Sequence, residues 1–167
     1  PEFANRHGAD LFISIHANAA LKKDARGVET YFLSFEATDE DARRLAEIEN
    51  SPAGGPDNGE AADDVLGDIL LSMVRTASHH ESARLAEVLH ERVLALTGRE
   101  DRGVKQAPFR VLVGASMPAV LVEVGFISNA QEEKGLASGR DQGLIAVSIA
   151  DGIAGFRQIL TKRKAYI

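Results

Sequence analysis

Apolar residues along the chain fall into short continuous runs, typical of buried strands, and into longer periodic stretches, typical of amphipathic helices. Three runs are predicted to be strands, and they cover residues 10–16 (DLFISIH), 27–34 (GVETYFLS) and 119–127 (AVLVEVGFI). The last of these runs is almost wholly apolar, which is typical of a central strand that is covered on both faces of a sheet, and the first is expected to be buried as well. A fourth, shorter strand is predicted over 109–113, just before the turn GASMP.

Between the strands predicted over 27–34 and 109–113, the apolar positions recur with helical spacing. A helix is predicted to begin after Thr38, because Thr38 and the acidic Asp41 have the spacing of a capping box. This helix should end near Asn50, where the segment SPAGGPDNG contains several turn-forming residues. Helical periodicity resumes at Ala61 and continues to Gly98, which is expected to terminate it.

Two more helices are predicted after the last strand. The pattern Asn129-Ala130-Gln131-Glu132 places an amide cap three residues before an acid, so a helix should begin at Asn129. A longer amphipathic helix is predicted over about 142–160. Strands that alternate with helices predict an α/β fold, in which a mostly parallel sheet is flanked by helices. A chain of 167 residues is long enough for a single domain with its own core.

Composition excludes several classes of function. The net charge is −6 and the basic residues are scattered, which argues against a nucleic acid as partner. No apolar run approaches the roughly 20 residues of a membrane-spanning helix, so no transmembrane segment is predicted. The chain has no cysteine, so a metal site would need His, Asp or Glu. Residues 1–3 (PEF) are interpreted as a cloning-vector scar, and the natural chain is expected to continue upstream of Ala4.

One carboxylate interrupts the most apolar strand. Glu123 lies in the middle of 119–127, where burial of an ionised carboxylate costs several kcal/mol unless a cation or hydrogen-bond donors compensate. A structural ion pair is one explanation. A metal site is another, because His16 ends a second predicted strand and ligand sites of open α/β sheets lie at the carboxyl ends of strands. The residues alone leave both explanations open.

Three segments, ADLFISIHANA, RGVETYFLS and LVEVGFISNAQEE, resemble the zinc-dependent N-acetylmuramoyl-L-alanine amidases of bacterial cell walls. The resemblance covers nearly all residues after Phe3. In that family two histidines and a glutamate bind zinc, and a further glutamate in the last motif acts in catalysis. By position, the resemblance implies that His16 is a zinc ligand and Glu123 the catalytic glutamate. The other two ligands would lie upstream, so the chain as it stands is expected to be inactive.

The function that this resemblance implies is hydrolysis of the amide bond between N-acetylmuramic acid and L-alanine of the peptidoglycan stem peptide. Zn²⁺ would activate a water molecule, and Glu123 would act as the general base. The enzyme would then be located in the periplasm or the cell envelope. Two alternatives stay open: a zinc carboxypeptidase or endopeptidase, which uses the same ligand chemistry, and an inactive regulatory or binding fragment.

A second carboxylate, Glu49, continues the apolar stripe that begins at Ala42 in the first predicted helix. The structural explanation is that Glu49 reaches water at the helix end. The resemblance implies another. Amidases of this family that act in cell division carry a helical insertion between these strands, and a glutamate of this insertion can occupy the zinc until an activator moves it. Residues 36–97 match that insertion, so Glu49 is a candidate inhibitory ligand and an activator of the cell-division machinery a candidate partner.

Overall fold

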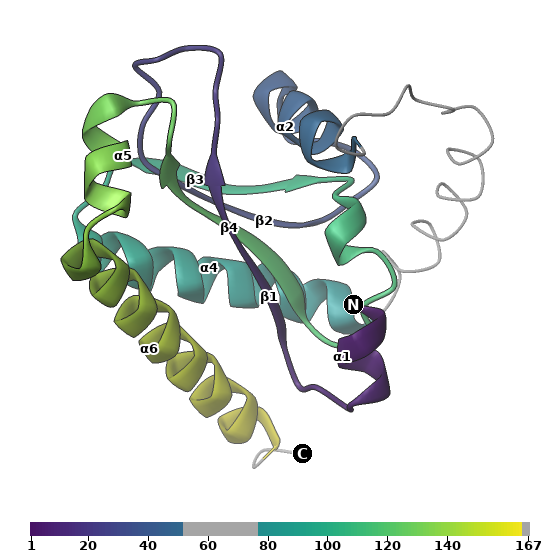
Figure 1. Cartoon of the computed structure of the whole chain (residues 1–167). Coiled ribbons are helices and arrows are strands. Elements are labelled where there is room, and N and C mark those ends of the chain that lie inside the picture. The colour runs from purple at the N-terminus through teal and green to yellow at the C-terminus, as the bar shows by residue number, and fades with distance from the viewer. Residues whose placement is uncertain (52–76, 165–167) are drawn as a thin grey trace. The chain divides into compact units, whose positions relative to one another are not determined.

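The computed structural model describes residues 1–51 and 77–164 (Figure 1). Its strands are β1 (Phe12–Asn18), β2 (Val28–Leu33), β3 (Asp101–Ala107) and β4 (Ala119–Phe126). Its helices are α1 (Glu2–Arg6), α2 (Glu40–Asn50), α4 (Ala77–Thr97), α5 (Ala130–Leu136) and α6 (Gly139–Lys164), with a 3-10 turn, η1 (Arg110–Leu112). The part of the predicted helix between Ala61 and residue 76 lies outside the described residues.

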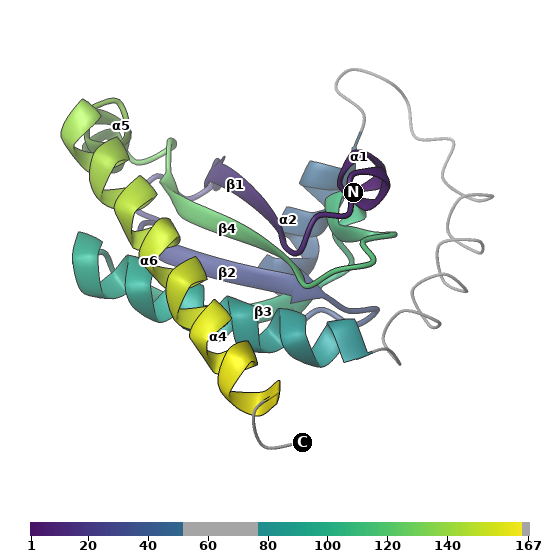
Figure 2. The same cartoon turned by 90° about the horizontal axis from the view of Figure 1, so that it is seen from below.

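The strands of the described residues form one sheet in the order β1-β4-β2-β3. At one end of the β1/β4 pair, the Phe12 N–H donates to the Pro118 carbonyl. At the other end, the Ile127 N–H donates to the Asn18 carbonyl, so the two strands are parallel. Strands β2 and β3 are paired in the same sense, whereas Figure 2 shows β4 and β2 pointing in opposite directions. The sheet is therefore mixed: β1/β4 and β2/β3 are parallel pairs, and β4/β2 is the antiparallel pair between them. Because most of the pairs are parallel, the predicted mostly parallel α/β fold is confirmed.

The two strands that carry the predicted site residues differ in burial. All eight residues of β4 are buried, as expected for a central strand covered on both faces. Strand β1 lies at the edge of the sheet, and Ile15 on it is 55% exposed. The prediction of a buried strand is therefore wrong for β1, because apolar residues at a sheet edge give the same sequence pattern.

The chain divides into two compact units. The first unit contains Pro1–Ser14, Tyr31–Ala83 and Lys105–Val120, and the second contains Ile15–Thr30, Arg84–Val104 and Leu121–Ile167. Helix α2 belongs to the first unit, while most of α4 belongs to the second. The predicted insertion over 36–97 thus contains helices of both units, and its regulatory role stays a prediction.

In the first unit, helix α2 is capped by Asp39 and not by Thr38. The Asp39 carboxylate accepts a hydrogen bond from the Ala42 N–H at 2.8 Å, which is the usual N-cap contact. The Thr38 hydroxyl instead accepts from the Gln106 N–H at 2.9 Å, so it links the segment before α2 to β3. Asp and Thr are both good caps, and the long-range contact of Thr38 decides which of them caps the helix.

The strand predicted over 109–113 is a single 3-10 turn, so this prediction is wrong. Phe109 is fully buried, and its ring meets the ring of Tyr31 edge-on at 4.9 Å between centroids. Leu112 is 1% exposed. These side chains pack an irregular segment into the core, so the apolar pattern of 109–113 reflects burial and not strand pairing.

In the second unit, α4 and α6 cover the same side of the sheet (Figure 2). The buried face of α4 carries Leu85, Leu89 and Val93, each fully buried. A Cβ atom placed at Gly152 on α6 would lie 2.7 Å from Leu89 Cδ2 and 3.3 Å from Leu89 Cα. Only a glycine therefore allows α6 to approach α4 this closely. Helix α4 ends as predicted at Gly98, where φ is +63°.

Helix α6 is long and apolar enough over Gly139–Thr161 to cross a membrane, judged by length and composition only. This finding is weak, because the core helix of a soluble protein has the same properties. Phe156 is fully buried, and Ile145 and Ile149 are each 7% exposed. The prediction that the chain has no transmembrane segment stays a prediction.

A buried histidine connects α4 to two strands. His90 is 5% exposed, and its Nδ1 lies 3.1 Å from Thr30 Oγ1 on β2. Its Nε2 lies 2.8 Å from Asp101 Oδ1 on β3. Thr30 is fully buried, so the row of three side chains offers no nucleophile to solvent. The hydrogen bond with His90 is the main cause that holds the pKa of the Asp101 carboxyl below its usual value, with help from the Gly103 N–H.

This contact predicts a pH dependence of stability. Because the pKa of Asp101 is lower in the folded chain than in the unfolded chain, the stabilisation is present above the unfolded pKa of about 3.9 and is lost as the pH falls through the folded pKa. We expect Asp101→Asn to lower the free energy of unfolding at pH 7 by about 0.5 kcal/mol, because the side chain is largely exposed. The difference from the original protein should shrink below about pH 4. Urea unfolding at several pH values measures it, with Asp24→Asn in an exposed loop as control, and an equal difference at pH 7 and pH 3 would contradict the prediction.

Candidate active site

The two residues predicted to act in catalysis lie on neighbouring strands of the second unit. His16 lies on β1, and Glu123 lies in the middle of β4. A ring nitrogen of His16 and a carboxylate oxygen of Glu123 are within 4.8 Å of each other. At this separation the imidazole could hold a metal ion while the carboxylate lies within reach of a water molecule bound to that ion.

The environment of the pair suits a metal ion and its water. Glu123 is fully buried, whereas His16 is half-buried. A buried carboxylate is tolerated beside a cation, and a low local dielectric strengthens that interaction. Imidazole nitrogen and carboxylate oxygen are both ligands that zinc prefers. The donor chemistry therefore fits zinc, and the pair supplies two of the groups that a catalytic zinc site needs.

The ends of the two site strands are joined just beyond the pair. The Ile127 N–H donates to the Asn18 carbonyl at 2.8 Å, two residues after His16. The Ala20 N–H donates to the Ser128 hydroxyl at 3.1 Å. The segment that follows β4 is thus bonded directly to the end of β1.

The capping pattern after β4 is confirmed at Asn129, whose Oδ1 accepts from the N–H groups of Gln131 and Glu132 at 3.0 and 3.3 Å. The predicted capping box is wrong for Glu132, because its carboxylate turns to other partners. Its Oε2 accepts from the Phe126 N–H at 2.7 Å, and its Oε1 accepts from the Gly27 N–H at 3.1 Å. Glu132 therefore joins the end of β4 to the start of β2, a role that the local sequence does not reveal.

Arg99 binds the same carboxylate. Its Nη1 lies 2.8 Å from Glu132 Oε1, and its Nη2 lies 3.2 Å from Asp141 Oδ2 on α6. The Arg99 and Glu132 side chains are only 10% and 11% exposed. A polar cavity of about 480 Å³ opens beside this cluster, with Arg26 and Glu100 also on its wall. The charged groups of the cavity bind one another, with Arg26 Nε 2.8 Å from Glu100 Oε2. Two arginines share the wall with Glu100, Glu132 and Asp141, so the cavity has one negative charge in excess and offers no uncompensated cation to an anionic ligand.

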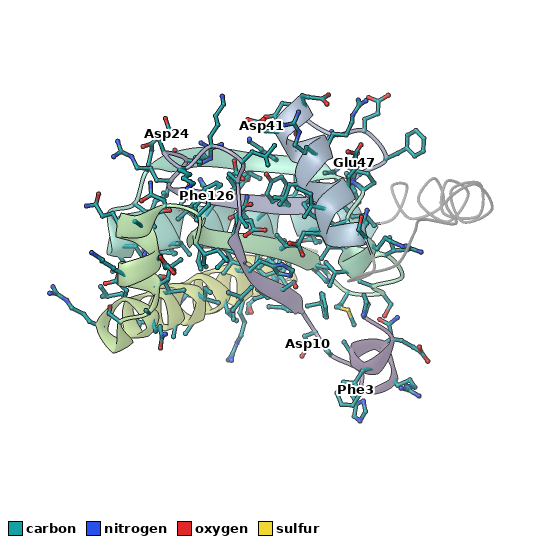
Figure 3. All side chains as sticks on the ribbon, turned by 45° about the horizontal axis from the view of Figure 1, so that its top comes forward. Phe3, Asp10, Asp24, Asp41, Glu47 and Phe126 are labelled. Atoms are coloured by element: carbon teal, nitrogen blue, oxygen red, sulfur yellow. The ribbon has the colours of Figure 1, made fainter. Side chains whose placement is uncertain are left out.

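A second charged pair lies near the end of β4. Arg102 Nε is 2.7 Å from Glu29 Oε1, and the Glu29 side chain is 3% exposed. The guanidinium carbon of Arg102 lies 5.1 Å from the centroid of the Phe126 ring, which Figure 3 shows at the end of the strand. A guanidinium over an aromatic face is attracted by the ring quadrupole, so this pair is packed as well as bonded.

Glu49 belongs to the first unit, near the end of α2. The predicted apolar stripe of this helix is confirmed, because Ala42, Leu45 and Ala46 are buried. Glu49 continues the stripe but is exposed, as the structural explanation for it requires. Its role as an inhibitory metal ligand stays a prediction.

Residues 1–155 match the family of N-acetylmuramoyl-L-alanine amidases, and the chain belongs to this family. Over 167 residues it is 32% identical to the amidase AmiA of Escherichia coli (strain K12), an alignment that covers 99% of this chain and 58% of AmiA. It is 36% identical to the amidase AmiC of Neisseria meningitidis serogroup B over 149 residues, 87% of this chain and 35% of AmiC. The chain thus spans about half the length, or less, of these curated relatives.

Solved structures agree with this assignment. The catalytic domain of CwlV, an N-acetylmuramoyl-L-alanine amidase from Bacillus (Paenibacillus) polymyxa var. colistinus, superposes with a TM-score of 0.63 at 29% identity. The alignment covers 94% of this chain and 63% of that one. The amidase AmiC2 of Nostoc punctiforme superposes with a TM-score of 0.60 at 28% identity and has the same coverage. The α/β fold is therefore the fold of amidase catalytic domains.

Proposed function

We propose that this protein is a peptidoglycan amidase that hydrolyses the bond between the lactyl group of N-acetylmuramic acid and L-alanine of the stem peptide. The observation that carries the proposal is the placement of Glu123, which is fully buried on the central strand with the His16 imidazole within 4.8 Å. Membership of the amidase family supports the same reaction. Because peptidoglycan is the substrate, the proposed location is the periplasm or the cell envelope.

The proposed mechanism assigns one task to each residue. Zinc, when bound, supplies a Lewis acid that polarises the amide carbonyl and lowers the pKa of a water molecule to about 7. His16 contributes an imidazole nitrogen that holds the ion. Glu123 takes a proton from the attacking water and delivers it to the leaving amine of L-alanine as the C–N bond breaks. The burial of Glu123 keeps bulk water away from this proton transfer.

Digestion of purified sacculi with the whole protein tests the proposal. An amidase releases intact stem peptides with a free L-alanine amine and leaves glycan strands that carry lactyl carboxylates. Mass spectrometry of the soluble products detects both. A zinc carboxypeptidase would instead shorten stems that stay attached to muramic acid, and an endopeptidase would open only the cross-links, so either product pattern would contradict the proposal. A fragment with a purely binding role would release nothing.

We also propose that Glu49 is an inhibitory ligand of the metal and that an activator protein of the cell-division machinery displaces it. The support for this role is the place of Glu49 near the end of α2, the first helix of the segment 36–97 that matches the family's insertion, together with membership of the amidase family. In the whole protein, Glu49→Ala should raise the basal activity without activator at least about fivefold, the lower end of typical coupling energies.

The control for this prediction is Glu47→Ala, because Glu47 is an exposed glutamate of the same helix (Figure 3) and lies about 200° from Glu49 around the helix axis. Turnover of a soluble muramoyl peptide measures both variants. Basal activity that stays flat or falls in Glu49→Ala, or that rises equally in Glu47→Ala, would contradict the inhibitory role.

A further inference from the structure

We propose that Glu132 is a positioning residue for the reaction proposed above, because its carboxylate fixes the end of the strand that carries Glu123, and the residues that follow this end are bonded to the strand that carries His16. The inference rests on the proposed function for its catalytic consequence, but its structural part stands on the contacts of Glu132 alone. Nothing in the local sequence around Glu132 requires it to do more than begin a helix.

The contacts of Glu132 are charge-assisted and shielded from solvent. One carboxylate oxygen accepts from the Phe126 N–H at 2.7 Å, and the other accepts from the Gly27 N–H at 3.1 Å. Arg99 Nη1 lies 2.8 Å from the second oxygen and neutralises the charge. Hydrogen bonds to an ionised acceptor are stronger and shorter than neutral ones. Glu132 thus holds two strand ends with one rigid group.

The position of Phe126 determines the position of Glu123, three residues earlier on the same strand. A β-strand is nearly fully extended, so it cannot lengthen to absorb a shift at its end. The cluster also packs directly on this strand. A Cβ atom at Gly125 would lie 2.7 Å from Arg99 Nη1 and 3.3 Å from Glu132 Oε2. Movement of the Glu132 cluster is therefore transmitted to the strand two residues from Glu123.

The same segment holds the strand that carries His16. Immediately after Phe126, the Ile127 N–H bonds to the Asn18 carbonyl, and the Ser128 hydroxyl accepts from the Ala20 N–H. Loss of the Glu132 contacts would free the end of β4 and, through it, the end of β1. Because proton transfer depends on the position of Glu123 and metal binding on the position of His16, both should deteriorate.

The test compares Glu132→Gln with Glu133→Gln in the whole protein. Both substitutions remove one negative charge from the first turn of α5, but Glu133 is exposed and lies about 100° from Glu132 around the helix axis. In Glu132→Gln, an amide NH₂ group replaces one acceptor oxygen and faces an N–H donor. Glu132→Asp is the second variant, because it keeps the charge but is one methylene too short to reach both strand ends.

The first readout is the dissociation constant of zinc, measured with the metal alone, which does not depend on activity. It should rise at least about tenfold in Glu132→Gln and in Glu132→Asp, as for other residues that orient metal ligands. It should stay within about twofold in Glu133→Gln. Amide hydrogen exchange at Phe126 and Gly27 should be faster in the first two variants only.

The second readout is turnover at saturating zinc, counted per folded molecule. In Glu132→Gln, kcat should fall at least about tenfold while KM changes less than about threefold, because the catalytic group is misplaced and the substrate contacts are kept. If Glu132 only stabilised the fold, the folded fraction would fall and kcat per folded molecule would not. The inference would be overturned if Glu132→Gln bound zinc as tightly as Glu133→Gln does. It would also be overturned if Glu132→Asp had the zinc affinity and kcat of the original protein. If the original protein released no stem peptides, the proposed function would fail, and the zinc and exchange measurements would still decide the role of Glu132.

Discussion

Glu123→Gln is expected to reduce amide hydrolysis at least about a hundredfold in kcat/KM and to leave one zinc ion bound per molecule. General base catalysis typically contributes a factor of about 100 to 10,000, and glutamine cannot accept the proton of the attacking water. The substitution preserves the size of a side chain that is fully buried, so the strand should keep its packing. Turnover of muramoyl peptide and metal analysis of the same sample measure the two effects.

Glu91→Gln is the matched control, because Glu91 is an exposed glutamate of α4. Two outcomes would change the assignment of Glu123. A variant that keeps more than a few per cent of the activity would show that Glu123 is not the general base. A variant that loses zinc together with activity would show that Glu123 acts as a metal ligand.

Arg102→Gln is expected to lower the free energy of unfolding by about 3 kcal/mol, the cost of leaving one partner of a buried ion pair behind. The Glu29 side chain, which is 3% exposed, would lose the guanidinium that lies 2.7 Å from it. The contact of the guanidinium with the Phe126 ring would also be lost. Urea unfolding followed by circular dichroism measures the difference.

Two further variants test the physical reason for this loss. Arg84→Gln makes the same substitution at an exposed position of α4 and should change the unfolding free energy by less than about 0.5 kcal/mol. The double variant Glu29→Gln with Arg102→Gln removes both charges and should recover part of the stability. If the double variant were less stable than Arg102→Gln alone, the burial of an uncompensated Glu29 charge would not be the cause of the loss in Arg102→Gln.

The sequence predicted the elements whose stability depends on local pattern. Strand β4 was evident because its apolar residues are continuous, and α5 because Asn129 caps it within three residues. The strand β3 was missed, since its sequence DRGVKQA is mostly polar. Its side chains are satisfied by distant partners, such as Asp39, whose carboxylate lies 3.0 Å from the Lys105 ammonium. Periodicity carries no information about contacts of this kind.

The candidate site was predictable to the extent that its chemistry is unusual. A carboxylate in the middle of an apolar strand identified Glu123, and a histidine at the end of another strand identified His16. Glu132 was interpreted only as part of a helix cap, because the capping pattern gave it a complete local explanation. Its partner Gly27 is 105 residues away in sequence, and the hydrogen bond between them exists only in the folded chain.

The contacts of Arg99 with Glu132 and with Asp141 have a consequence for how this part of the protein can change during evolution. Substitutions within one bonded cluster do not contribute independently to stability, so the cost of replacing Arg99 depends on whether Glu132 is still present. Once the Glu132 carboxylate is lost, the mostly buried guanidinium keeps only its contact with Asp141 and has lost its main partner, so the loss of Glu132 alone is costly. While the carboxylate is present, replacing Arg99 leaves a mostly buried negative charge uncompensated. Neither residue should therefore be lost alone, and the two should be exchanged as a pair.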